Sequence, residues 1–109
     1  MDRPEILIFA AQDAQTRLSE VLFGIEEEGV PYRVAEAFGD AGANAHRAAV
    51  ESRLGIGVGA AQGRIAVTTE KLDPAAPYIQ TNLNASKAVD RAVGANAARL
   101  VKRIPLKAL

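Results

Sequence analysis

The order of apolar runs and helical spacings along the chain divides it into eight predicted elements. Residues 5–10, EILIFA, hold a continuous apolar run that is typical of a central strand covered on both faces. Residues 14–28 carry apolar side chains three and four positions apart, which predicts an amphipathic helix. The other predicted elements are strand 32–35, helix 45–53, strands 54–60, 64–69 and 78–81, and helix 86–103. This β-α-β-α-β-β-β-α order predicts one α/β domain over residues 1–109, a sandwich with a mixed, partly parallel sheet and about three helices.

Glycine and proline mark the connections between these elements. Residues 38–44 are rich in Gly, Asp and Asn and are predicted to form a loop. Gln62 and Gly63 predict a hairpin turn between two neighbouring strands. Strand 54–60 alternates apolar residues with glycine, which leaves one of its faces bare for the close approach of another element. Pro105 ends the last helix.

The helix predicted at residues 14–28 has recognisable ends. Asp13 or Thr16 is expected to cap its start. At its other end, Gly29 suits the left-handed position that follows a helix and so has a structural role, and Pro31 prevents continuation. The buried stripe of this helix is predicted to consist of Leu18, Val21, Leu22 and Ile25.

Three carboxylates, those of Glu26, Glu27 and Glu28, occupy the last turn of this helix, where the helix dipole favours cations. Each misplaced charge costs roughly 0.3–1 kcal/mol at an exposed helix end. Either solvent absorbs that cost, or a metal ion or basic partner compensates the cluster. Glu27 points about 160° away from the buried Ile25 and is the carboxylate most freely presented to a partner, with the other two at its flanks.

The last predicted helix carries one polar residue near its buried direction. Asn96 lies about 40° from the apolar Leu100, so its amide needs partners inside the protein. We expect a structural role, in which the amide bonds a backbone group of a neighbouring loop. The basic residues at the C-terminal end of the helix suit its dipole and are also available for a subunit contact; they are Arg99, Lys102, Arg103 and Lys107.

Composition and charge narrow the classes of function. The chain of 109 residues holds 13 basic and 13 acidic side chains, and this neutral balance argues against a nucleic-acid or anionic-membrane binder. It has no cysteine, which excludes disulfides and thiolate sites and suits a reducing cytoplasm. No apolar run approaches the ~18 residues of a membrane span, and no signal-peptide pattern opens the chain. A neutral chain that is 49% hydrophobic is suited to a permanent protein partner.

Groups that point to catalysis are scarce. His46 is the single histidine and has no Asp, Cys or second His at metal-ligand spacing. The glycines at 55, 57 and 59 invite a dinucleotide interpretation, but a strand follows them where a helix N-terminus is needed. The residues alone therefore predict a small non-enzymatic α/β module, without a cofactor of its own, that exposes an acidic corner.

Two separated motifs resemble the small subunit of diol and glycerol dehydratase reactivases, the reactivating factors of adenosylcobalamin-dependent dehydratases. The first motif is residues 21–31, VLFGIEEEGVP, and the second is residues 94–106, GANAARLVKRIPL. They occur in the order and at the separation typical of that family, and the similarity spans nearly the whole chain.

The resemblance implies a chaperone-like cycle in the cytoplasm, with association with a bacterial microcompartment left open. The partner would be a large ATPase subunit that binds ATP or ADP, and the dehydratase would be met indirectly, through subunit exchange that releases damaged cobalamin. By position in the motif, Glu27 would lend a ligand to a Mg²⁺ ion at the contact with the large subunit. Glu26 and Glu28 would then be partner contacts.

Two alternatives remain open at this point. The medium subunit of the dehydratase itself shares the fold, but it normally has an N-terminal extension for which a first strand near residue 5 leaves no room. A free-standing small-ligand module of flavodoxin-like build would need a phosphate-cradling loop after the first strand. Residues 10–13, AAQD, offer an acidic residue there instead of glycines.

Overall fold

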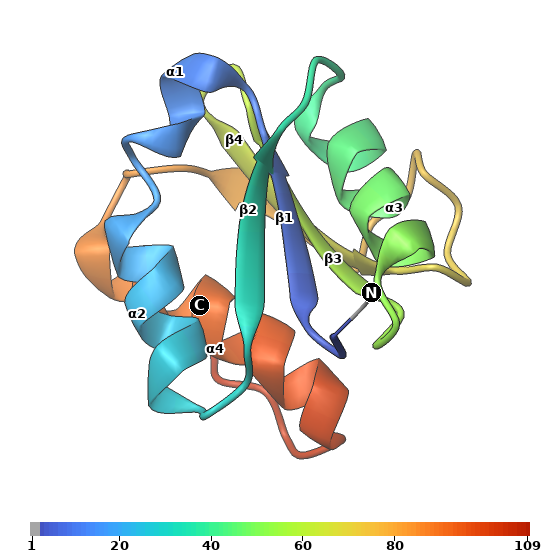
Figure 1. The fold of residues 1–109 in the computed structure, drawn as a ribbon. Coiled ribbons are helices and arrows are strands. Elements are labelled where there is room, and N and C mark those ends of the chain that lie inside the picture. The colour runs from blue at the N-terminus through green and yellow to red at the C-terminus, as the bar shows by residue number, and fades with distance from the viewer. Residues whose placement is uncertain (1–2) are drawn as a thin grey trace.

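Five strands form one mixed sheet in the order β2-β1-β3-β4-β5 (Figure 1). The computed structural model describes residues 3–109. The strands are β1 (Ile6–Ala10), β2 (Tyr32–Glu36), β3 (Ile56–Ala61), β4 (Arg64–Thr69) and β5 (Ile79–Asn82). Strand β1 pairs in parallel with β2 and β3, whereas β4 is antiparallel to β3 and β5. The predicted α/β class with a mixed, partly parallel sheet is therefore confirmed.

Helices cover both faces of this sheet, so the molecule has three layers. The helices are α1 (Gln12–Gln15), α2 (Ser19–Glu27), α3 (Ala41–Glu51) and α4 (Lys87–Lys102). Helices α2 and α4 lie side by side on one face, and α3 packs against the other (Figure 1). Three of the four match the predicted helices, and the fourth is the single short turn of α1.

The two faces of the sheet are built differently. On the side of α2 and α4, large apolar side chains such as Ile6, Ile8 and Val58 are fully buried. On the side of α3, Gly57 and Gly59 of β3 lie so near the helix that an added Cβ would overlap its backbone. The bare face predicted for residues 54–60 is therefore the seat of α3.

Glycine also sets the contact between α2 and α4. A Cβ on Gly24 would overlap the backbone of α4 at Arg91, and a Cβ on Gly94 would overlap the backbone of α2 at Val21. The two helices consequently touch backbone to backbone, with one glycine from each at the crossing. This close approach fixes where the polar side chains of the two helices meet.

The structure corrects the prediction of one helix over residues 14–28. The chain turns after α1 and begins α2 at Ser19. At this break the side-chain amide of Asn84 donates to the Arg17 carbonyl. Asp13 lies inside α1, Thr16 follows its end, and no side chain caps α2. The predicted caps were therefore wrong, because a tertiary contact, rather than a local capping bond, fixes the start of α2.

A second correction concerns the segment 38–44, predicted as a loop. Helix α3 already begins at Ala41, because the Asp40 carboxylate accepts a hydrogen bond from the Ala43 amide at 2.8 Å and caps it. Residues 41–44 therefore belong to the helix, and only the part before Ala41 is a loop. The hairpin turn at Gln62 and Gly63 is confirmed, with φ of 56° and 73°.

Candidate subunit-contact surface

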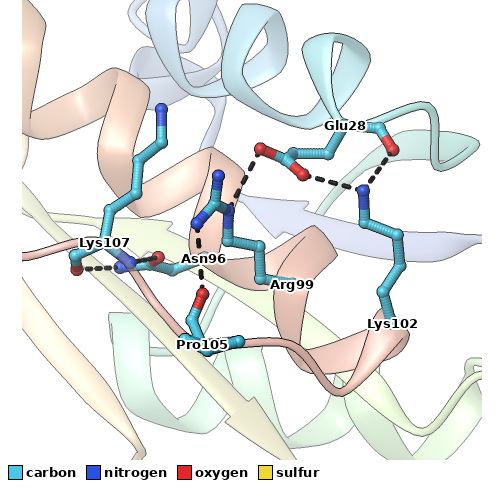
Figure 2. Close-up of polar contacts among 6 residues, drawn as sticks. All are labelled: Glu28, Asn96, Arg99, Lys102, Pro105 and Lys107. Atoms are coloured by element: carbon cyan, nitrogen blue, oxygen red, sulfur yellow. Dashed lines mark hydrogen bonds and ion pairs between the residues drawn. The ribbon is translucent and has the colours of Figure 1, made fainter.

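The acidic end of α2 packs against α4, which supplies a basic side chain to two of its three glutamates. Glu28 is the most enclosed of the three, with a side chain 12% exposed. Its Oε1 lies 2.7 Å from Lys102 Nζ and its Oε2 lies 3.1 Å from Arg99 Nε (Figure 2). Lys102 Nζ also donates to the Glu28 carbonyl at 2.9 Å, so it neutralises both the carboxylate and the end of the helix.

These contacts favour the ionised form of the Glu28 carboxyl. The hydrogen bond from Lys102 lowers the pKa of the Glu28 carboxyl below its ordinary value, and Arg99 lowers it further against the opposing effect of desolvation. The carboxylate is therefore held ionised, with both oxygens engaged by the chain itself. The structure shows Glu28 partly enclosed and paired within the chain, and its contact with a partner stays a prediction.

Glu27 is more open and is held at one oxygen. Its side chain is 53% exposed, and its Oε2 accepts from Arg91 Nη1 at 2.9 Å. The same guanidinium donates twice to Glu20 Oε1, at 2.9 and 2.6 Å, and lies 5.5 Å from the centre of the Phe23 ring. The carboxylates of Glu20 and Glu27, chiefly through the hydrogen bond to Glu20, raise the pKa of Arg91. Glu27 is therefore held at Oε2 by an arginine that Glu20 also binds, while about half of its side chain stays exposed.

Glu26 faces away from α4, toward the start of β2. Its Oε1 accepts from the Tyr32 hydroxyl at 2.7 Å, and this bond raises the pKa of Tyr32. Each carboxylate of the cluster therefore has a partner within the chain. Sequence reasoning expected either solvent or an external cation; the structure shows instead that Arg91, Arg99 and Lys102 compensate much of the cluster.

Asn96 makes the backbone hydrogen bonds predicted for it. It is 1% exposed, its Nδ2 donates to the Lys107 carbonyl at 3.0 Å, and its Oδ1 accepts from the Lys107 amide at 2.6 Å (Figure 2). Its partner is the C-terminal tail rather than a loop. Arg99 Nη1 donates to the Pro105 carbonyl at 3.1 Å, so the tail, α4 and the end of α2 meet at this arginine. Gly29, after the helix end, has a φ of +77°.

Neither a metal cluster nor a membrane span is present in the part of the chain that the structure describes. Within residues 3–109, no three His, Cys, Asp or Glu side chains converge as metal ligands. None of the helices in the same range is long and apolar enough to cross a bilayer.

Known proteins are similar to this chain in sequence and in fold. The family model of the dehydratase medium subunit matches residues 3–107. The small subunit of the propanediol dehydratase-reactivating factor of Citrobacter freundii is 37% identical over 95% of this chain and 90% of its own length. The corresponding Salmonella typhimurium protein is 36% identical over 97% of this chain and 92% of its own.

Solved structures agree. One chain in the structure of a diol dehydratase-reactivating factor complexed with ADP and Mg²⁺ has a TM-score of 0.92 at 33% identity, covering 98% of this chain and all of its own. A chain of a glycerol dehydratase reactivase has a TM-score of 0.91 at 34% identity, covering 97% of this chain and 98% of its own.

Proposed function

The chain belongs to the dehydratase medium-subunit family, and we propose that it is the small subunit of a reactivating factor for a diol or glycerol dehydratase. The observation that carries this proposal is the match to reactivating-factor small subunits over nearly the full length of both chains. The likeness to a solved reactivating factor, with a TM-score of 0.92, supports it. The medium subunit of the dehydratase and a free-standing ligand module are not favoured by these relatives.

In this proposal the chain is a non-catalytic subunit that recognises other proteins. A large partner subunit binds and hydrolyses ATP. The small subunit is exchanged for the medium subunit of the dehydratase, and this exchange lets damaged cobalamin leave. The ion pairs between α2 and α4 support such a role, because they give the surface a fixed arrangement of charge before any partner binds. In this proposal the complex acts in the cytoplasm.

Glu27 is the residue that we propose as a ligand for Mg²⁺ at the contact with the large subunit. A hard divalent cation takes oxygen ligands and bridges carboxylates of two surfaces readily. Glu27 fits this role because it is half-exposed and is held within the chain at Oε2, by Arg91. Its neighbours fit less well, since Glu28 is enclosed by two cations and Glu26 is bonded to Tyr32.

The matched variants Glu27→Gln and Glu26→Gln test this assignment. Glu27→Gln removes an exposed ion pair, so the isolated chain should lose no more than about 1 kcal/mol of stability. Its affinity for the large subunit should fall and lose its dependence on Mg²⁺, because a neutral amide oxygen is a poorer ligand for a hard cation. Glu26→Gln should retain both. Titration calorimetry with Mg²⁺ and with a chelator measures these affinities.

Reactivation of glycerol-inactivated dehydratase by the reconstituted complex tests the wider function. Equal losses of affinity for both variants would point to diffuse charge instead of a ligand, and unchanged affinity for Glu27→Gln would exclude the bridging ion. A complex that forms but fails to restore dehydratase activity would contradict the function as a reactivating factor.

A further inference from the structure

Phe38, in the loop between β2 and α3, is the most exposed large hydrophobic side chain in the described structure, at 88%. The next most exposed is Val50, at 56%. A single exposed apolar side chain is common on protein surfaces and by itself implies nothing. What distinguishes Phe38 is the way in which the chain holds it.

The backbone on both sides of Phe38 is fixed. Before it, the Ala37 amide donates to the Ala10 carbonyl at 3.0 Å, and the Ala37 side chain is buried. After it, the buried side-chain amide of Asn44 makes two hydrogen bonds to the backbone of Gly39. It accepts from the Gly39 N–H and donates to the Gly39 carbonyl, both at 2.9 Å. Arg47 Nη2 donates to the same Asn44 oxygen at 2.6 Å. The ring is thus presented to solvent by a braced segment.

The outward side chains before and after Phe38 in the segment are acidic. Glu36 and Asp40 are exposed while Ala37 between them is buried, so the segment alternates outward and inward like a strand. Glu36, Phe38 and Asp40 are therefore the side chains that this segment turns outward, and we call them the Phe38 stripe. Arg47, an exposed cation that binds Asn44, lies beside Gly39 and offsets one of the two negative charges of the stripe, which leaves a net negative charge.

We propose that the Phe38 stripe is a docking element for the large subunit, in which the Phe38 ring enters an apolar pocket bordered by Lys or Arg. The identity of the partner rests on the proposed function; the chemistry of the site rests on the stripe. Aromatic side chains that are fixed before binding lose little entropy on association and anchor interfaces for that reason. The flanking carboxylates select a basic rim and accelerate the encounter.

The same charges argue against other occupants. A two-fold contact between copies of this chain would place two stripes face to face and gather four carboxylates with only two Arg47 cations, so the excess negative charge opposes it. An anionic lipid surface would be repelled as well. A basic protein surface is the occupant that satisfies both the ring and its flanks.

The stripe also lies apart from the proposed metal ligand. Glu27 is at the end of α2, near the start of β2, whereas Phe38 follows the end of β2, at the other end of that strand (Figure 1). A standard interface buries about 800 Å² on each partner, which on a molecule with 29 Å as its longest dimension extends across most of one side. One large partner can therefore reach both ends of β2.

The test compares Phe38→Ala with Tyr78→Ala in the full chain. Tyr78 is a matched control, because it is an exposed aromatic residue, at 54%, beside the opposite edge strand, β5. Both variants should keep the melting temperature of the wild type. Phe38→Ala should weaken binding to the purified large subunit by about tenfold or more, with or without Mg²⁺, and Tyr78→Ala should change it by less than about threefold.

A charge variant tests the rim. The double change Glu36→Gln with Asp40→Asn removes both charges and keeps a side-chain oxygen to cap α3. It should slow association and reduce its dependence on ionic strength. Equal affinities of Phe38→Ala and Tyr78→Ala would overturn the proposal, as would a dimer of the isolated chain that Phe38→Ala dissociates. If the wild-type chain forms no complex at all, the proposed function fails and the assignment of this partner fails with it.

Discussion

Asn96 and Asn44 use the same device at two places in the fold. Each is a buried asparagine on a helix whose amide bonds both the N–H and the carbonyl of one residue in an irregular segment. Asn96 holds the tail at Lys107, and Asn44 holds the loop at Gly39. In both cases the side-chain amide supplies hydrogen bonds to a backbone N–H and carbonyl that lie outside any strand. An asparagine near the buried direction of a helix therefore indicates where a neighbouring segment is attached.

Replacement of Asn96 tests the attachment of the tail. Asn96→Leu should lower the free energy of unfolding by about 1–3 kcal/mol, because two hydrogen bonds are lost and the tail backbone must find water. Asn96→Asp should also destabilise, since a carboxylate can accept from the Lys107 amide but repels its carbonyl. Denaturant unfolding measures both changes, and faster hydrogen exchange of the Lys107 amide would locate them. An unchanged midpoint for both variants would contradict the role of the amide.

The lowered pKa of Glu28 predicts a dependence of stability on pH. A carboxyl whose pKa is lower in the folded than in the unfolded state stabilises the fold above its unfolded pKa, near 4.3. That contribution is lost as the pH falls through the lowered folded pKa. At neutral pH, Glu28→Gln should be less stable than the wild type by about 1 kcal/mol. The loss is this small because Arg99 and Lys102 are partly exposed, so solvent weakens their ion pairs with Glu28.

The difference between the two proteins should stay constant above about pH 5 and shrink below it. Urea unfolding at a series of pH values provides the measurement, and Glu26→Gln serves as the comparison at the same helix end. A difference that persists undiminished at pH 2 would show that the two cations do not act through the charge of Glu28.

At the scale of elements, glycine decides how closely the helices approach. Gly94→Ala raises intrinsic helix propensity by about 1 kcal/mol, yet its Cβ would overlap the Val21 backbone, so α2 and α4 would have to separate. We expect a net loss of about 2 kcal/mol or more in unfolding free energy. Gly29→Ala is the contrasting change, because nothing lies within 4 Å of its Cβ position and only its φ of +77° is strained.

Thermal denaturation distinguishes these two causes of destabilisation. Gly29→Ala should cost about 1–2 kcal/mol and leave the contact between α2 and α4 unchanged. Gly94→Ala should in addition weaken the ion pairs that cross from α4 to α2, and so reduce the pH dependence attributed to Glu28. A stabilised Gly94→Ala protein would refute the close helix crossing.

Elements whose cause is local were predictable from the sequence. Gln62 and Gly63 identify their turn because its positive φ angles demand such residues. The break before α2 was not predictable in this way, since the contact at its centre comes from Asn84, 67 residues away. The start of α3 lies between these cases: the cap at Asp40 is a local signal, but the surrounding Gly and Asn residues obscured it.

On the scale of the whole molecule, the surface features with a local cause were predictable from the sequence, and those that depend on contacts between distant residues were not. The acidic cluster and its misplacement at a helix end were visible, and the outward direction of Glu27 followed from helical geometry. Its compensation by Arg91, Arg99 and Lys102 was not visible, because charges on two helices become neighbours only through the tertiary fold. Phe38 gave no pattern at all, as its exposure depends on how Asn44 positions the loop.

The pairing of α2 with α4 also has a consequence for the biosynthesis of the chain. Its ion pairs join residues 64 to 74 positions apart, such as Arg91 with Glu27 and Lys102 with Glu28. A ribosome releases the N-terminal part first, so the apolar stripe of α2 stays without its α4 partner until residues 87–102 have emerged. Closing such long loops is slow, because chain entropy is lost before the contacts form. We therefore expect the core to close only after α4 has been synthesised and released.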